Sequence, residues 1–435
     1  MIEFNPESNL QLSLLLFGGT IKEDAIEPSC DAQGAPIIFK TGARAGQIKT
    51  RRVEVHRVIK GLGLRPLKEW ETKRAGIYST DDEVLTLLAK KKGSDGGRIA
   101  ELMLTIRNIN KQLSTYFDNV EKLIYPDGCI HPSFTHVQTD TSRLSSRNPN
   151  VQNVPKSFES NVKQHFTSRY PGGKIIECDF SQLEIVVQAQ LCQDKKYIQD
   201  ILNKVDFHVK RLATQENLPY EKVLHKVKVE KDPIWIEKRS KIKQFSFARA
   251  YGAGPNKIAD QTGMSVEEVK DLIKNEDIEY PQLKRYNDML EEFVKYTAKG
   301  GDLGYYCSPT SRRYYFKSEP APEWMQKKGI YTSFRPTQIK NYMVQGTATG
   351  DIVLIMLGKF FREAIKHRDK FLLINTVHDS IILDCREEYV DFACQLLQEV
   401  LSSTKDAMKK EFNIDWVVPI EFETKVGESW YECGL

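Results

Sequence analysis

The chain has 435 residues, of which 63 are Lys or Arg and 59 are Asp or Glu, so the formal net charge is +4. An apolar fraction of 40% supports several cores and argues against global disorder, and the near balance of charge excludes a wholly basic coating protein. The length is typical of about three domains or subdomains. Because long apolar runs and a basic-then-apolar start are both missing, we expect neither a membrane span nor a secretory signal.

Residues 1–130 are predicted to be mostly helical. The apolar run over 10–17 predicts a short helix that Gly18 and Gly19 end. Apolar residues in steps of three and four predict an amphipathic helix over 99–124, of about 26 residues and roughly 39 Å. Its apolar positions are Leu102, Ile106, Ile109, Leu113, Phe117, Val120 and Ile124, and its charged face includes Arg98, Arg107 and Lys111.

A basic segment over about 24–74 lies between these helices. Residues 51–59 partly alternate between polar and apolar, which is typical of a strand with one polar face. The segment contains 11 Lys or Arg residues and six acids, so two interpretations stay open: a solvated surface insertion, or an insertion that faces nucleic acid.

Two carboxylates follow or join predicted strands later in the chain. Residues 174–179 predict a strand that ends in Asp179, followed by a helix over 181–191. Residues 371–377 and 381–384 predict a hairpin whose turn holds Asp379. Each Asp alone is explained as an ordinary turn residue, but two converging carboxylates would form an oxygen site for Mg²⁺.

A helix without an internal breaker is predicted over 239–252. Arg239, Lys243, Phe247 and Tyr251 recur at every fourth position, so one broad face presents two cations and then two aromatic rings. This order suits the phosphates, sugar and base of a nucleoside triphosphate. An amphipathic surface helix with an aromatic anchor is the structural alternative.

Several segments resemble, in order, the motifs of family A DNA polymerases, the bacterial DNA polymerase I type, and more closely its bacteriophage members. The opening 4–17 resembles the start of the thumb. The other matching segments are SRLSS…PNVQNVP (142–155), DFSQLE (179–184), RxxxKxxxFxxxYG (239–252), QGTA (345–348) and VHD (377–379).

The resemblance implies an α+β, multidomain fold: the right-hand polymerase, with a helical thumb, a palm built on an antiparallel sheet, and helical fingers. We expect the thumb at 1–130 with the basic insertion at about 24–74, the palm at 131–205 and 345–435, and the fingers at 206–344. The implied activity is that of a template-directed DNA polymerase, a nucleotidyltransferase of DNA replication that extends a primer 3′ end with dNTPs and releases pyrophosphate.

The implied catalytic residues are Asp179, Asp379 and Lys243. The two aspartates, with the carbonyl of Phe180, would hold two Mg²⁺ ions. Lys243 would bind the triphosphate and protonate pyrophosphate, and Arg239 would contact the terminal phosphate.

Other residues would contact the nucleotide or its sugar. His208 is implied as a second phosphate contact, although a structural role is the alternative for an isolated histidine. Phe247 would pack on the deoxyribose, while Glu184 would exclude a 2′-hydroxyl and pair with Tyr251. Gln182 belongs to the same motif and is assigned to the nucleotide site. Tyr251 would also stack at the template position, and Gly252 would permit the bend beside it.

The implied DNA contacts fall into two groups. Arg143, Gln345 and His378, with Asn341 as a further candidate, would face the minor groove at the primer end, where the base pairs offer similar acceptors. Arg107 and Lys111 would grip phosphates without reading bases.

The sequence departs from the family pattern at several places. Ser380 stands where the family commonly has Glu, and Val186 replaces a family Arg. The insertion is long for a plain thumb and would bind a processivity factor or more duplex. The chain starts at the thumb, so we expect no intrinsic proofreading, and a DxE tripeptide at 277–279 falls in the fingers. Two explanations of the missing exonuclease stay open: it is a separate subunit, or this chain is a fragment of a longer protein.

Partners and location follow from the same resemblance. Primer-template DNA and dNTPs are the expected partners, with no membrane. The eight cysteines form no CxxC pair and no zinc spacing, which indicates reduced thiols in the cytoplasm, or the host cytoplasm for a phage protein.

Two alternatives remain. A single-subunit RNA polymerase shares the palm and the fingers helix, but Glu184 would hinder rNTP use. A non-catalytic DNA-binding protein on the same scaffold would not need Asp179, Asp379, Arg239 and Lys243.

Overall fold

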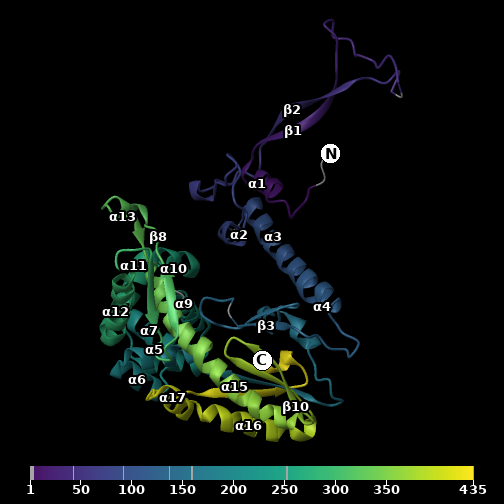
Figure 1. Ribbon diagram of the computed structural model, residues 1–435. Helices are drawn as coiled ribbons and strands as arrows, with labels where there is room; N and C mark the ends of the chain where they lie inside the picture. The colour runs from purple at the N-terminus through teal and green to yellow at the C-terminus, as the bar shows by residue number, and fades with distance from the viewer. Residues whose placement is uncertain are drawn as a thin grey trace. The chain divides into compact units, whose positions relative to one another are not determined.

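The computed structural model describes residues 4–42, 44–91, 93–136, 138–157, 160–250 and 253–434 (Figure 1). The chain forms two compact units, Met1–Glu121 and Lys122–Leu435. Helices and antiparallel strands both contribute, so the expected α+β class is confirmed.

The first unit has a small helical core. Its helix α1 (Asn9–Phe17) begins after Ser8, whose hydroxyl accepts a hydrogen bond from the N–H of Gln11, and ends at Gly18 with φ of 79°. This confirms the first predicted helix. Helices α2 (Asp82–Ala89) and α3 (Asp95–Gln112) share the core, whose buried residues are Leu12, Leu16, Val84, Leu85, Leu88, Ala100 and Met103.

The second predicted helix is present with different ends. α3 begins at Asp95, and a π-helical stretch (Leu113–Asp118) and α4 (Asn119–Glu121) continue it. Its apolar stripe is largely exposed in this unit: Leu102 is 59% exposed and Ile109 is 50% exposed. The buried residues of α3 are instead Gly96, Gly97, Ala100 and Met103. Gly96 packs closely, because a Cβ there would lie only 2.5 Å from a methyl group of Leu64.

A long two-stranded ribbon follows α1. β1 (Gly19–Pro28) and β2 (Thr50–Ile59) pair antiparallel in unbroken register, from Gly19↔Ile59 to Pro28↔Thr50 (Figure 1). β2 confirms the strand predicted over 51–59, whereas β1 corrects the prediction that 1–130 is mostly helical. Most side chains of β2 are exposed, so this ribbon has no buried face that a regular alternation would mark.

The second unit is built around a four-stranded antiparallel sheet. The strand order is β10–β11–β5–β12, and their bounds are β5 (Lys174–Phe180), β10 (Phe371–Val377), β11 (Ser380–Cys385) and β12 (Phe422–Gly427). The predicted strands and hairpin are therefore confirmed. Ile176, Cys178 and Phe180 point into the main core, and Ile175 points to the opposite face beside Trp430.

Helices pack on the main-core face of this sheet. Figure 1 shows α15 and α16 lying along it. The helices that contribute buried residues to this core include α5 (Leu183–Cys192), α15 (Val353–Ala364), α16 (Val390–Ser402) and α17 (Thr404–Phe412). α5 starts close to the predicted residue 181 and leads directly from the end of β5.

The part of the sequence between β5 and β10 forms a second helical core. Its helices are α7 (Phe207–Gln215), α8 (Tyr220–Lys228), α9 (Pro233–Ala250), α10 (Pro255–Thr262) and α11 (Val266–Glu279). The neighbouring elements are α6 (Lys195–Leu202), α12 (Pro281–Ala298), β6 (Leu303–Cys307), β7 (Arg313–Lys317), α13 (Glu323–Gln326) and α14 (Pro336–Gln345). Short strand pairs complete the unit: β3 (Ser133–Thr135) with β4 (Ser145–Arg147), and β8 (Glu319–Pro320) with β9 (Thr332–Ser333). The carboxyl end is α18 (Trp430–Cys433).

None of the helices in the described ranges has the combination of length and apolar character that a bilayer crossing requires. All eight cysteines are free.

Candidate functional site

Asp179 and Asp379 lie at the same end of two paired strands. β5 pairs with β11 so that Asp179 is opposite Ser380, the residue after Asp379. The N–H of Phe180 donates to the main-chain carbonyl of Asp379 at 3.2 Å. The fold thus places two carboxylates that are far apart in the sequence next to each other.

The two carboxylates repel each other. The Asp179 side chain is open to solvent, yet the protein around it removes part of its hydration. This loss of hydration, followed by the charge of Asp379, raises the pKa of Asp179 to about 7. Burial also raises the pKa of Asp379, and Arg143 partly offsets the shift. A bound divalent cation would relieve this repulsion, so the pair fits the oxygen ligands that Mg²⁺ takes from a protein.

The backbone beside both carboxylates adopts left-handed conformations. His378, in the two-residue turn before β11, has φ of 56°, and Gln182, just before α5, has φ of 50°. Such values cost a residue with a Cβ on the order of 1–2 kcal/mol. Strain of this kind concentrates at functional sites. Both residues are exposed, yet the protein around the His378 ring removes part of its hydration, which lowers the pKa of His378.

Arg143 forms hydrogen bonds with side chains from two other segments of this region. Its Nη2 donates to Oε1 of Glu184 at 3.0 Å, and its Nε donates to the hydroxyl of Thr349 at 2.7 Å. Glu184 lies in the first turn of α5. Burial raises its pKa, while Arg143 opposes that shift. The pair holds the predicted sugar-discriminating carboxylate and a predicted DNA contact in one cluster.

The segment after α14 continues this cluster. Gln345 ends α14 and is 6% exposed, and its carbonyl accepts a hydrogen bond from the hydroxyl of Thr349 at 2.9 Å. Asn341 lies half-buried one turn earlier. Two predicted DNA contacts are therefore on the helix that leads into the Thr349 segment.

The predicted nucleotide-binding helix is α9. It carries Arg239 and Lys243 on one stripe, with Lys243 exposed and Arg239 half-buried. The backbone of Phe247 belongs to α9, but its side chain, like Tyr251 and Gly252, lies outside the described residues.

Asp206 anchors Arg239 to the neighbouring helix. Oδ2 of Asp206 accepts from both Nε and Nη2 of Arg239, at 3.1 and 2.7 Å. Its other oxygen, Oδ1, caps α7 by accepting from the N–H groups of His208 and Val209. Although burial favours the protonated acid, the bond from Arg239 holds the pKa of Asp206 below its usual value.

His208 is a neutral ring in this setting. Burial, followed by the charge of Arg211, lowers the pKa of His208 to about 4. Its Nδ1 lies 3.1 Å from the hydroxyl of Ser246 on α9. At neutral pH the imidazole is therefore uncharged and suited to donate a hydrogen bond to a phosphate, without adding positive charge.

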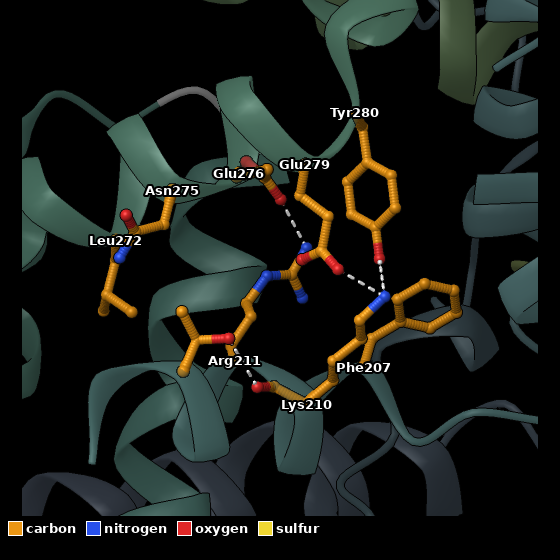
Figure 2. Close-up of a pocket in the computed structure, with 9 residues that line it drawn as sticks. Phe207, Lys210, Arg211, Leu272, Asn275, Glu276, Glu279 and Tyr280 are labelled. Carbon is orange, nitrogen blue, oxygen red and sulfur yellow. Dashed lines mark hydrogen bonds and ion pairs between the residues drawn. The ribbon is translucent and has the colours of Figure 1, made fainter. Parts of the chain in front are cut away.

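A buried ion-pair network fixes α9 to α7 and α11, and Figure 2 shows its centre. Arg211 pairs with Glu276 and also donates to the hydroxyl of Ser246 at 3.1 Å. The second oxygen of Glu276 lies 3.8 Å from Nε of Arg249 on α9. The Glu276 side chain is only 11% exposed, so removal of its charge would leave Arg211 as a largely buried charge without its partner.

Lys210 forms the second half of this network. It pairs with Glu279 and donates to the hydroxyl of Tyr280 at 3.1 Å (Figure 2). It also pairs with Asp200. The same Tyr280 hydroxyl donates to Asp200 at 2.8 Å. Glu279, part of the DxE tripeptide, is thus engaged in an ion pair within the helical region.

The two cations predicted in the first unit differ in their surroundings. Nη1 of Arg107 donates to Asp82 at 3.0 Å and to the carbonyl of Thr80 at 2.7 Å. Lys111 is exposed one turn further along α3. Arg107 therefore supports the packing of α3 against the start of α2, while Lys111 faces solvent.

The sequence patterns assigned no role to Asp206, Ser246, Arg211 or Glu276. Asp206 had a detectable signal, because an Asp followed by an apolar helical run is typical of an N-cap. The Arg211–Glu276 pair had none, since the two residues lie on different helices.

A solved polymerase domain has a similar architecture. The structure titled "POL domain of Pol1 from M. smegmatis complex with DNA primer-template and dNTP" superposes with a TM-score of 0.65 at 23% identity, covering 84% of this chain and 58% of that one. The fold is therefore that of a polymerase domain. The sequence model of DNA polymerase family A matches residues 54–432, and the chain belongs to this family.

Curated relatives agree with this assignment. DNA polymerase I of Chloroflexus aurantiacus is 28% identical over 415 residues, covering 94% of this chain and 39% of the relative. DNA polymerase I of Geobacillus stearothermophilus is 26% identical over 359 residues, covering 82% and 37%. The Bacillus subtilis enzyme is 28% identical over 378 residues, covering 86% and 38%. The chain thus spans about two fifths of the length of these relatives.

Proposed function

We propose that this chain is a template-directed DNA polymerase that extends a primer 3′ end with dNTPs and releases pyrophosphate. The observation that carries the proposal is the adjacency of Asp179, on β5, and Asp379, in the turn before the paired strand β11, in a member of family A. The Mycobacterium smegmatis domain in complex with primer-template and dNTP supports the same substrates.

Asp179, Asp379 and the carbonyl of Phe180 would hold two Mg²⁺ ions. When bound, the ions promote ionisation of the primer 3′-hydroxyl and stabilise charge on the leaving pyrophosphate. The protein's contribution is to place Asp179 at the end of β5 beside Asp379 in the turn before β11. Both carboxylates would stay ionised beside the bound ions, because positive charge offsets their mutual repulsion. Catalysis then depends on positioning and on charge stabilisation, without a covalent intermediate on the protein.

The cations of α9 would bind the triphosphate. Arg239 offers a planar guanidinium already held in place by Asp206, which suits bidentate phosphate contact. Lys243 is exposed one turn further on and would donate a proton to the pyrophosphate oxygen. The neutral His208 would add a directed hydrogen bond, and the exposed Gln182 would lie near the incoming nucleotide.

Glu184 would select deoxyribose. Its carboxylate, fixed by Arg143 at 3.0 Å, would occupy the space of a 2′-hydroxyl, and Phe247 would pack on the sugar with Tyr251 beside it. This favours a DNA polymerase over the single-subunit RNA polymerase alternative. Comparing dNTP with rNTP incorporation on one primed template separates the two.

DNA contacts would come from both units. Arg143, Gln345 and His378, with Asn341, would face the primer-end minor groove. Lys111 would contact phosphates. Arg107 is paired with Asp82, so it would contact a phosphate either together with that pair or in place of it. Duplex binding without extension would instead favour a non-catalytic DNA-binding protein.

We also propose that the chain has no proofreading of its own. Glu279 of the DxE tripeptide at 277–279 forms an ion pair with Lys210, which supports a structural role for that acid. A separate exonuclease subunit and the cytoplasm as the site of action remain part of this proposal.

Primer extension tests these proposals together. A labelled primer on a longer template should lengthen only with Mg²⁺ and dNTPs, and EDTA should stop the reaction. A mismatched primer incubated with Mg²⁺ alone should keep its length. If the wild-type chain does not lengthen a matched primer, the polymerase proposal is wrong, and if it shortens the mismatched primer, the proofreading proposal is wrong.

A further inference from the structure

The two-stranded ribbon of the first unit and its tip, residues 19–60, are here called the β-arm. Figure 1 shows β1 and β2 running away from α1 as a ribbon of their own. Most side chains of β2 are exposed, and among the described residues Val58 is 78% exposed and Ile26 is 69% exposed. An isolated pair of strands is at best marginally stable in water, so the arm is expected to gain order from a partner.

The far half of the β-arm, residues 28–52, carries charge mainly of one sign. The sequence there contains five Lys or Arg residues and one acid, Asp31. The cations are all exposed and are Lys40, Arg44, Lys49, Arg51 and Arg52. Oδ1 of Asp31 accepts from the N–H groups of Gln33 and Ala35, so the acid is used within its own turn.

The near half of the β-arm is different. Nζ of Lys22 pairs with Glu54 at 2.8 Å, and His56 lies 3.1 Å from the same carboxylate. In the far half, by contrast, none of the five cations forms an ion pair with a described residue, although Glu27 lies opposite Arg51 in the strand register. An excess of cations over acids along one stretch of ribbon attracts a polyanion.

Apolar side chains alternate with these cations. Ile38 and Ile48 form a bridge across the tip and are 49% and 48% exposed. Nζ of Lys49 lies 5.2 Å from the centre of the Phe39 ring. Cations with apolar groups between them match a nucleic-acid groove, where phosphates flank sugar and base edges.

We propose that the far half of the β-arm binds double-stranded DNA. Its cations contact phosphates on either side of a groove, and a two-stranded ribbon has the width that the major groove admits. These contacts with phosphates are electrostatic and do not depend on the DNA sequence. They therefore add affinity for duplex DNA without adding base specificity. The inference concerns binding alone and does not require the chain to catalyse extension.

Binding of a blunt, labelled duplex of about 30 base pairs, measured by fluorescence anisotropy over a series of salt concentrations, tests the proposal. The variant carries K40Q, R44Q, K49Q, R51Q and R52Q in the full chain. Each lost phosphate contact makes the negative slope of log affinity against log salt shallower by about 0.9. Loss of all five contacts therefore makes it shallower by about 4.5. We expect at least about 10-fold weaker binding at low salt.

A charge-matched control separates local contact from net charge. It replaces five exposed lysines of the second unit with Gln: Lys317, Lys327, Lys328, Lys366 and Lys410. This control should bind duplex with a clearly steeper salt slope than the arm variant. Equal slopes for the wild-type chain and the arm variant would overturn the proposal and would indicate a protein partner for the arm. A matching loss in the control would overturn it as well.

Two further measurements keep the result interpretable. Thermal unfolding followed by circular dichroism should match between the wild-type chain and the arm variant, because the changed side chains are exposed. The arm variant at saturating concentration should still extend a short primer-template, since the active site is untouched. If the wild-type chain fails to extend any primer, the polymerase proposal fails while the binding comparison still decides the role of the arm.

Discussion

Nη2 of Arg143 lies 3.0 Å from Oε1 of Glu184, and this pair joins the loop before β4 to α5, the helix that follows β5. Neither side chain is fully exposed: 22% of Arg143 and 27% of Glu184 is accessible. The pair means that the carboxylate proposed to exclude a 2′-hydroxyl is held by the residue proposed to contact the primer.

Glu184→Ala is expected to raise rNTP incorporation, because it removes the group that would fill the space of a 2′-hydroxyl. Selection against one small group is worth about 10- to 200-fold, so a rise within this range is expected. Steady-state incorporation of one rNTP and the matching dNTP opposite the same template base measures the ratio. Glu184→Gln, which retains the volume, serves as the control and should change the ratio less. An unchanged ratio in Glu184→Ala would remove Glu184 from the sugar site.

Asp379→Asn is expected to abolish extension by at least about 1000-fold, because one of the two carboxylate ligands is lost. Duplex binding should persist, since the change is confined to one turn residue. Rapid-quench extension and anisotropy on the same primer-template measure both quantities. Glu423→Gln is a matched control, because Glu423 lies opposite Asp179 on β12 without belonging to the proposed ligand pair. Near-normal extension by Asp379→Asn would contradict the metal assignment.

The stability of the metal-free protein should depend on the protonation of Asp179. Its pKa is raised from 3.8 to about 7 in the folded state. A raised pKa means that the stabilising contribution of the protonated acid is fully present below about 4 and is lost as pH rises through about 7. Urea unfolding in EDTA across this pH range should show a steeper fall for the wild-type chain than for Asp179→Asn. Parallel profiles would contradict the shift.

Mg²⁺ should reverse this pH dependence. Because the ions need ionised carboxylates, Mg²⁺ affinity is expected to increase as pH rises through about 7. Titration of the metal-free protein with Mg²⁺ at several pH values, followed by isothermal calorimetry, measures the change. An affinity that is independent of pH between about 6 and 8 would not fit the repulsion between Asp179 and Asp379.

Glu276→Gln is expected to destabilise the second unit by about 3–5 kcal/mol, because it leaves Arg211 as a largely buried charge without its partner. Glu267→Gln on the same helix is the matched control, since Glu267 is exposed. Chemical unfolding measures both. The KM for dNTP should also rise more than kcat falls, because Ser246 and Arg249 connect this network to α9. Equal stability of the two variants would show that the pair is not needed.

The local elements were predictable because burial leaves a period in the sequence. The apolar run before Gly18 and the apolar runs on either side of Asp379 predict a helix and a hairpin that the structure confirms. The order of the motifs also indicated the family that the comparison then showed. Periodicity failed for β1, since a ribbon with both faces in solvent needs no apolar alternation, and it did not reveal that the stripe of α3 stays exposed.

The sequence by itself determined the local elements and the family. Only the tertiary structure decided that Asp179 and Asp379 meet, that Arg143 holds Glu184, and that Asp206 holds Arg239. The physical reason is that local periodicity records how each segment meets solvent and core, whereas contacts between distant segments depend on strand register and helix packing. Those contacts are what give the carboxylates their raised pKa and orient the cations of α9.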